Sequence, residues 1–204
     1  MDWDSYFFNI CSMVAQRSKC MSRQIGAVLV RDNTIIGTGY NSPPRKVPTC
    51  GERYYLDTNL REALKQRDID PDDVKYHSIC PRYVLGFKSG EGLEWCVAGH
   101  AEKNCLINSA RIGICTKGSI MYMTCGIPCT PCLVSIINAG VTEIVVTEKS
   151  YYDVSASYLI QNSDLEVRIF KHLCKHEHTP LCTICKDCGE YVISKGEENE
   201  SKNL

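Results

Sequence analysis

The sequence predicts an α/β fold, a three-layer α/β/α sandwich around a mixed sheet of about five strands. Three observations indicate this fold class. The chain opens with an amphipathic segment, two apolar runs joined by turn residues follow it, and strand and helix patterns alternate from residue 119 to residue 170. Such alternation implies right-handed crossovers between parallel strands, whereas the two earlier runs imply an antiparallel hairpin. We therefore expect both kinds of strand pairing in one sheet.

The opening helix and the hairpin are read from residue spacing. Apolar side chains recur at helical intervals over residues 5–17, behind Asp4 or Ser5 as the cap. Residues 25–30 and 35–40 have strand character on either side of a short polar turn. The helix is expected to cover one face of the sheet that begins with this hairpin.

An irregular segment follows the hairpin. Residues 41–99 contain a predicted helix at 58–67 and otherwise prolines, glycines and acidic turns. An insertion of this length in a compact domain needs something to hold it in place. Regular patterns then return as three strands and three helices, at residues 100–111, 119–124, 130–140, 143–147, 154–162 and 165–170.

Three segments follow from this division of the chain. Residues 1–170 form the predicted domain, residues 171–194 a small cysteine- and histidine-rich unit, and residues 195–204 a polar tail. A chain of 204 residues is long enough for one sizeable core and an appendage, and too short for a second full domain.

The composition limits the partners. Twenty-three basic and 24 acidic residues give a net charge of −1, and no run of lysine or arginine is dense enough to follow a phosphate backbone. A small charged substrate therefore suits the chain better than a polynucleotide. The acidic N-terminus and the lack of a long apolar stretch predict a cytoplasmic protein without a membrane segment. In a reducing compartment, CxxC spacings among 14 cysteines favour metal over disulfides.

Two short motifs are predicted to form one zinc site. His100-Ala101-Glu102 and Pro128-Cys129-Thr130-Pro131-Cys132 both fall at helix starts. The pairing of HxE with PCxxC is the signature of zinc-dependent nucleobase deaminases. Three protein ligands, His100, Cys129 and Cys132, leave a tetrahedral zinc one open position, which is typical of a catalytic site. PCxxC alone would also fit a structural zinc corner or a redox pair, and HAE alone occurs by chance, so the prediction depends on both motifs together.

Glu102 is the predicted proton carrier of this site. Residues two apart on a regular helix normally face opposite sides, so we expect the metal at the helix mouth, within reach of both His100 and Glu102. The positive ends of both helices point at the same place and favour thiolate and hydroxide. Glu102 is expected to take a proton from the attacking water and to return it to the ring nitrogen and departing amine of an amidine-like group.

With its flanking residues, the chain resembles the deoxycytidylate (dCMP) deaminases of the cytidine deaminase-like superfamily, over roughly residues 5–170. The resemblance is carried by residues 18–28 (SKCMSRQIGAV), Gly39-Tyr40-Asn41, HAE with the following Lys103-Asn104, and residues 122–129 (YMTCGIPC). It implies conversion of dCMP to dUMP, with a small nucleotide as substrate.

The resemblance also implies substrate contacts and regulation. Asn41 would hold the deoxyribose, and an asparagine there is also simply a good turn residue. We predict Arg23 and Tyr152 as contacts of the 5′-phosphate, because little else nearby is basic. Family members are often homo-hexamers switched by dCTP and dTTP, with a GYNG turn near the effector. Ser42 replaces its last glycine here, which puts effector control in doubt.

The other cysteines suggest structural zinc. Relatives often carry a second zinc, and the available quartet is Cys20, Cys50, Cys80 and Cys96, with His77 as a substitute for Cys80. Four thiolates there would clamp the insertion. Residues with zinc-knuckle spacing predict a third zinc: Cys174, His176, Cys185 and Cys188, with His178 or Cys182 as alternates. The alternative for the quartet is that some of these cysteines are small buried apolar residues. The alternative for the third zinc is a cysteine-rich tail without a fixed structure. The remaining cysteines, Cys11, Cys105, Cys115 and Cys125, are interpreted as packing.

Two other functions compete with the nucleotide deaminase. A base deaminase acting on tRNA or single-stranded DNA needs a basic groove, and only the lysines and histidines of the tail favour it. A scaffold protein that binds zinc only for stability and catalyses no reaction would not need the carboxylate of Glu102.

Overall fold

The computed structural model describes residues 1–151 and 153–170. Within them a five-stranded sheet has the order β2-β1-β3-β4-β5. Its strands are β1 (Gly26–Arg31), β2 (Thr34–Tyr40), β3 (Ile120–Met123), β4 (Glu143–Val146) and β5 (Glu166–Ile169). The α-helices are α1 (Trp3–Ala15), α2 (Cys50–Leu56), α3 (Thr58–Lys65), α4 (Pro81–Val84), α5 (Ala101–Arg111), α6 (Thr130–Asn138) and α7 (Val154–Gln161). Two 3-10 turns, η1 (Val74–Tyr76) and η2 (Leu93–Trp95), lie between α3 and α5.

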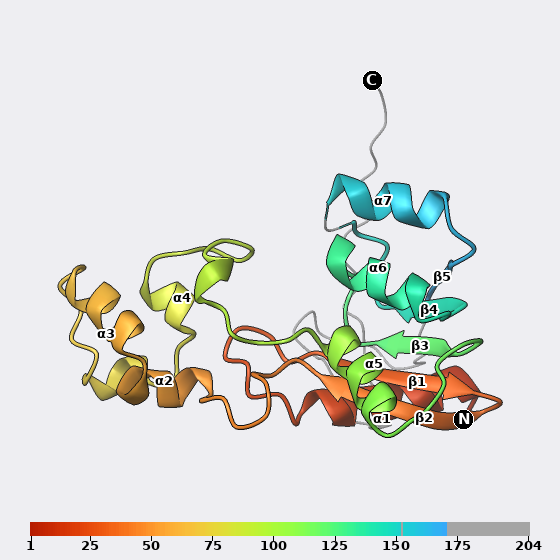
Figure 1. The fold of residues 1–204 in the computed structure, drawn as a ribbon, viewed down its shortest axis with the longest axis horizontal. Helices are drawn as coiled ribbons and strands as arrows, with labels where there is room; N and C mark the ends of the chain where they lie inside the picture. Colours follow the sequence, from red (N-terminus) through yellow and green to blue (C-terminus); the bar gives the residue numbers. More distant parts are fainter. Residues whose placement is uncertain (152, 171–204) are drawn as a thin grey trace, which may run out of the picture.

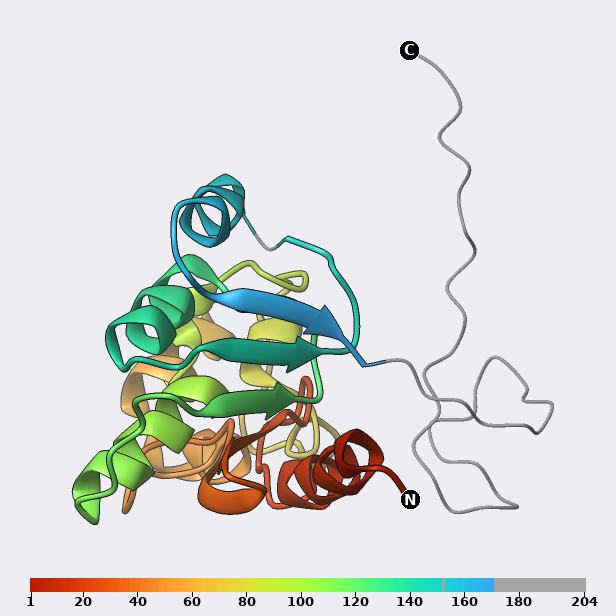
Figure 2. The ribbon, with the colours of Figure 1, turned by 90° about the vertical axis from the view of Figure 1, so that its right-hand side faces the viewer.

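The sheet is mixed, as predicted. β1 pairs antiparallel with both β2 and β3, whereas β3, β4 and β5 run parallel to one another. Helices lie on both faces, with α1 on one side and α5, α6 and α7 on the other (Figure 2). No helix among the described residues is both long and apolar enough to cross a membrane.

Alternating side chains of the strands build two cores. Ala27, Leu29 and Met121 face α5 and α6 and are completely buried. Val28 and Val145, on the opposite face, pack with Phe7 and Phe8 of α1 and with other buried residues. Because helices cover both faces of the sheet, side chains on both sides of β1, β3 and β4 are mostly apolar.

The opening helix begins earlier than the sequence analysis predicts. Asp2, rather than Asp4 or Ser5, caps α1, because its carboxylate accepts a hydrogen bond from the backbone N–H of Ser5 at 2.8 Å. Asp4 lies in the first turn and instead accepts hydrogen bonds from the Tyr122 hydroxyl, at 2.7 Å, and from Arg168 of β5. Asp4 therefore ties α1 to the sheet.

The insertion at 41–99 forms a helical lobe with its own small core. α2, α3 and α4 lie together at the left of Figure 1, away from the sheet. Tyr54, Leu60, Leu64 and Leu85 are almost completely buried within this lobe. The two ends of the lobe meet at an isolated β-bridge between Ser42 and Gly99. Apolar packing and backbone pairing thus hold the insertion in place.

Candidate functional site

The site lies at one edge of the sheet, where three strands place their ends together. Gly26, which begins β1, is opposite Tyr40, which ends β2, and Ala27 is opposite Met123, which ends β3. Residues that precede β1 and residues that follow β2 and β3 therefore meet at this edge. Ligands of open α/β sheets bind at the carboxyl ends of the parallel strands, which is the edge where β3 ends.

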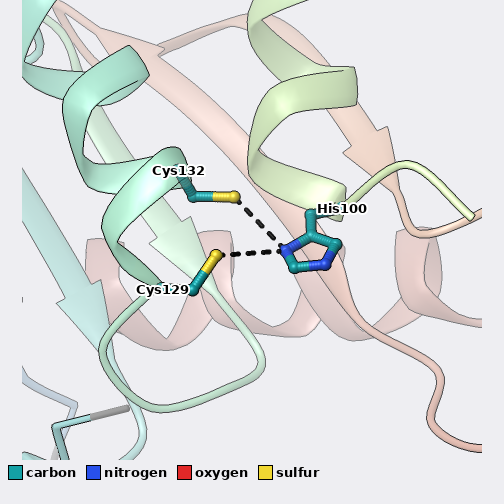
Figure 3. Close-up of side chains that lie close together, drawn as sticks. All are labelled: His100, Cys129 and Cys132. Atoms are coloured by element: carbon teal, nitrogen blue, oxygen red, sulfur yellow. Dashed lines mark hydrogen bonds between the residues drawn. The ribbon is translucent and has the colours of Figure 1, made fainter. Parts of the chain in front are cut away.

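His100, Cys129 and Cys132 converge from two helix starts (Figure 3). His100 is the N-cap of α5 and Cys129 the N-cap of α6, with Cys132 in the first turn of α6. The Nδ1 atom of His100 lies 3.5 Å from the Sγ of Cys129 and 3.3 Å from the Sγ of Cys132. All three ligand atoms lie within 4.8 Å of one another. This is the arrangement that the two motifs predict.

The donor set fits zinc. Bond lengths of about 2.0 Å to imidazole and 2.3 Å to thiolate imply separations of roughly 3.5 Å between tetrahedral ligand atoms. The measured 3.5 and 3.3 Å agree with that value. Two sulfurs and one imidazole are ligands that favour zinc over magnesium or calcium. Three protein ligands leave the fourth position open.

The two thiols and the imidazole are electrostatically coupled. The hydrogen bond from Cys132, followed by that from His100, lowers the pKa of Cys129 to about 4. The same hydrogen bond to Cys129 raises the pKa of Cys132, because the two sulfurs share one proton. Hydrogen bonding to Cys129 also raises the pKa of His100. A thiolate is thus present at neutral pH, and the thiolate is the form that binds metal.

Glu102 lies beside these ligands in the first turn of α5 and is 5% exposed. Burial is the largest cause that raises the pKa of its carboxyl group above the ordinary value, while His100 and Arg23 oppose the shift. A buried carboxyl group with a raised pKa next to a metal site is typical of a proton-transfer residue. His100 has extended backbone at φ −70° and ψ 152°, outside the helix, so the spacing of two does not put it opposite Glu102.

A cavity of about 350 Å³ opens in front of these residues. Its walls come from the loop before β1, the start of α5, the segments after β3 and β4, and the lobe at 41–99. Among the lining residues are His100, Glu102, Cys129, Asn41, Arg23 and Arg82. The volume is in the range of small-ligand pockets.

Asn41 and Arg23, the predicted contacts of the deoxyribose and the 5′-phosphate, both line this cavity. The side-chain amide of buried Asn41 accepts a hydrogen bond from the backbone N–H of Ile25 at 2.8 Å and donates one to the carbonyl of Arg23 at 2.7 Å. Asn41 therefore fixes the loop that carries Arg23 and keeps one N–H for another acceptor. Arg23 is exposed, and its charge lowers the pKa of Glu102. Tyr152, the other predicted phosphate contact, lies outside the described residues.

The predicted structural zinc sites have different outcomes. Burial, followed by the nearby thiols of Cys80, Cys20 and Cys96, raises the pKa of Cys50 to about 11. Within the described chain, the three-residue group around His100 is the cluster with ligand atoms within 4.8 Å, and the quartet does not reach that spacing. His77 instead hydrogen-bonds the hydroxyl of Tyr55 at 2.5 Å and the carbonyl of Pro71 at 2.9 Å.

The remaining predictions concern candidate ligands in the tail and four cysteines interpreted as packing. The tail candidates lie outside the described residues: Cys174, His176, His178, Cys182, Cys185 and Cys188. Cys11 and Cys105 are fully buried and Cys125 is half-buried, as expected for packing. Cys115 is exposed, so the packing interpretation is wrong there, because the turn after α5 carries it away from both cores. Arg82, which the sequence analysis did not select, also lines the cavity.

The chain matches the family model "Cytidine and deoxycytidylate deaminase zinc-binding region" over residues 1–148. The deoxycytidylate deaminase of Schizosaccharomyces pombe is 32% identical over 166 residues, which cover 81% of this chain and 43% of that protein. The deoxycytidylate deaminase of Mycobacterium phage D29 is 32% identical over 154 residues, which cover 73% of this chain and 97% of the phage protein. The chain thus spans less than half the length of the yeast relatives.

The fold has a counterpart among solved structures. The dCMP deaminase of cyanophage S-TIM5, in its apo form, superposes with a TM-score of 0.54 at 19% identity, covering 82% of this chain and 96% of that one. The complex of the same enzyme with dCMP and dUMP gives a TM-score of 0.53 at 20% identity. At these identities the likeness concerns the fold.

Proposed function

The chain belongs to the cytidine and deoxycytidylate deaminase zinc-binding family, and from this premise we propose that it hydrolyses dCMP to dUMP and ammonia. One observation carries the proposal: His100, Cys129 and Cys132 converge beside the buried carboxyl group of Glu102, at the wall of a cavity. Relatives that are 30% or more identical over most of this chain are deoxycytidylate deaminases, which supports dCMP as the substrate.

The proposed mechanism assigns one task to each side chain. Zinc, when held by His100, Cys129 and Cys132, polarises a water molecule and lowers its pKa. Glu102 takes a proton from the attacking water and donates it to the ring nitrogen of cytosine as oxygen bonds to C4. It then carries the remaining hydroxyl proton to the amine, the C4–N bond breaks, and ammonia leaves as the C4 carbonyl forms. Asn41, in the cavity wall, orients the sugar.

Glu102 also decides between this enzyme and a zinc-stabilised scaffold. Burying a carboxyl group costs free energy, which appears here as a raised pKa. A purely structural zinc gains nothing from such a neighbour. We therefore propose turnover rather than a scaffold function.

Further features of the proposal extend beyond the catalytic centre. A second zinc at Cys20, Cys50, Cys80 and Cys96 is supported by the closeness of Cys50 to the other three. The third zinc, the zinc-knuckle unit at 171–194, the homo-oligomer, the dCTP and dTTP effectors and the cytoplasmic location stay predictions from the sequence.

The test is a substrate panel. Purified zinc-loaded protein is incubated with dCMP, CMP, dCTP and an RNA hairpin, and loss of the cytosine absorbance is followed. We expect turnover of dCMP well above the other three. Turnover of the RNA hairpin without turnover of dCMP would reject the proposed substrate in favour of polynucleotide deamination.

A further inference from the structure

Arg82 has an unusual position for an arginine. It lies in the first turn of α4, in the lobe at 41–99, and is 7% exposed. It nevertheless lines the cavity that holds Glu102 and His100. The lobe thus places a permanent positive charge in the wall of the proposed active site, because the arginine guanidinium keeps its proton in proteins.

The guanidinium of Arg82 is only partly satisfied by the described residues. Its Nη1 atom donates a hydrogen bond to the carbonyl of Glu91 at 2.6 Å. Its Nε atom is buried and has no hydrogen-bond partner in the described part of the chain. Among those residues, no carboxylate lies within 4.0 Å of this charge, since the ion pairs involve Arg53, Arg61, Lys75 and Arg168.

Arg53 shows what a fully satisfied buried arginine looks like in the same lobe. It is 6% exposed, almost the same as Arg82. Its Nε atom donates to the carboxylate of Asp57 at 2.8 Å and its Nη1 atom to the carbonyl of Trp95 at 2.6 Å. Arg53 is not among the residues that line the cavity. The arginine without a carboxylate partner is therefore the one that faces the cavity.

A buried charge without a counterion is costly unless a ligand supplies one. The ring of Tyr83 has its centroid 5.8 Å from the guanidinium carbon and leaves the Nε–H unpaired. The N–H groups of a planar guanidinium bind phosphate oxygens, and Arg82 presents part of its side chain to the cavity. Glu102 and Glu148 line the same cavity, but neither forms an ion pair with Arg82, so an anionic ligand would supply the missing partner of this buried cation.

We infer that Arg82 binds the 5′-phosphate of the substrate nucleotide. The inference rests on the proposed function, because deamination puts the base at His100 and Glu102 and leaves the phosphate to another part of the same cavity. Tyr83, next to Arg82, shares a 2.5 Å hydrogen bond with Ser22, which joins α4 to the loop of Arg23. Arg23 lines the same cavity but is exposed, so water can solvate its charge, whereas Arg82 is 7% exposed.

The experiment compares a substrate that has the phosphate with one that lacks it. For Arg82→Gln we expect the KM for dCMP to rise by about 10–100-fold, the size expected for a lost charge-assisted hydrogen bond, with a smaller change in kcat. The kcat/KM for deoxycytidine should stay close to that of the wild type. Arg82→Lys keeps the charge but not the planar fork, so it should recover part of the loss.

Arg53→Gln is the matched control. It removes an equally buried guanidinium from the same lobe, so it should lower the melting temperature without separating dCMP from deoxycytidine. Zinc content is measured for each variant, because Cys80 lies two residues before Arg82. Loss of zinc from Arg82→Gln, together with equal losses on both substrates, would assign Arg82 to the support of the cysteines and overturn the inference.

The outcomes separate this inference from the proposed function. If the wild type deaminates dCMP and both Arg82 variants keep its KM, the phosphate assignment is wrong and the function stands. If the wild type deaminates neither substrate, the function is wrong, and calorimetry with dUMP and deoxyuridine then tests Arg82 directly. Tighter binding of dUMP that disappears in Arg82→Gln would support the phosphate contact, and equal binding of the two ligands would refute it.

Discussion

At the scale of single residues, His100, Cys129 and Cys132 meet because each lies at the start of a helix, and this local placement is why the two motifs predict the cluster. A cysteine that caps a helix and a second cysteine three residues later share one helix mouth in almost any fold. Arg82 was missed for the opposite reason. Its burial and its missing partner depend on the packing of a lobe far along the chain, and an arginine in a sequence looks the same whether it is solvated or buried.

The proton-transfer role of Glu102 leads to the first residue-scale prediction. Glu102→Gln preserves the shape of the side chain and its place beside His100 but removes the group that accepts a proton. We expect kcat for dCMP to fall by about 10²–10⁴-fold while zinc content is retained. Steady-state kinetics and metal analysis check this. The exposed carboxylate of Glu62, on α3, gives the control Glu62→Gln; activity retained in Glu102→Gln would remove Glu102 from the mechanism.

At the scale of elements, the strands and the helices of eight or more residues were predicted, whereas the cap of α1 and the shorter helices α2 and α4 were not. α2 was missed although its start carries a capping box, in which the carboxylate of Glu52 accepts hydrogen bonds from the backbone N–H and the hydroxyl of Thr49. α4 has only four residues, so it has no period to detect. Its helical form depends on the fold of the lobe around it.

The close contact between β2 and α5 predicts a sensitive glycine. A Cβ atom on Gly39 would lie 2.2 Å from the backbone nitrogen of Cys105 and 2.5 Å from the carbonyl oxygen of Ala101, so α5 would have to move. We expect Gly39→Ala to lower the free energy of unfolding by ~1–3 kcal/mol, as measured by denaturant titration. It should also weaken zinc retention, because His100 caps the displaced helix.

Gly51→Ala is the control for that experiment. A Cβ there meets the flexible end of Met21 at 3.0 Å and the carbonyl oxygen of His77 at 3.3 Å, and Gly51 lies inside helix α2, where alanine is favoured over glycine. Its stability should stay near that of the wild type. A Gly39→Ala variant as stable as the wild type would contradict the prediction, because β2 and α5 would then accommodate the extra Cβ without loss of stability.

At the scale of the whole molecule, the mixed sheet was predictable because each crossover has a preferred hand and each connection has a readable length. The helical lobe at 41–99 was not predictable in this way. Its core of Tyr54, Leu60, Leu64 and Leu85 joins residues up to 31 positions apart, and nothing local specifies that meeting. The cysteine quartet was proposed to hold the insertion, and apolar packing supplies at least part of that support.

Metal content tests the molecule as a whole. If Cys20, Cys50, Cys80 and Cys96 bind a second zinc, Cys50→Ser should contain one zinc fewer per chain and melt at a lower temperature, because metal binding is coupled to folding. The catalytic zinc should remain. Exposed Cys115→Ser provides the control. Unchanged zinc content in Cys50→Ser would leave the quartet as ordinary buried thiols.

The bridge between Ser42 and Gly99, made by backbone hydrogen bonds of 3.2 and 2.9 Å, has a consequence for how such a protein can diversify. It closes the lobe into a cassette whose entry and exit are adjacent, so its contents can be exchanged while the sheet keeps its form. The cassette contributes Arg82, Ser89 and Leu93 to the cavity, whereas His100, Glu102 and Cys129 come from the frame around it. Under the proposed function, exchange of the cassette would alter the part of the cavity wall that Arg82 forms, while Asn41, His100, Glu102 and Cys129 keep their places in the frame.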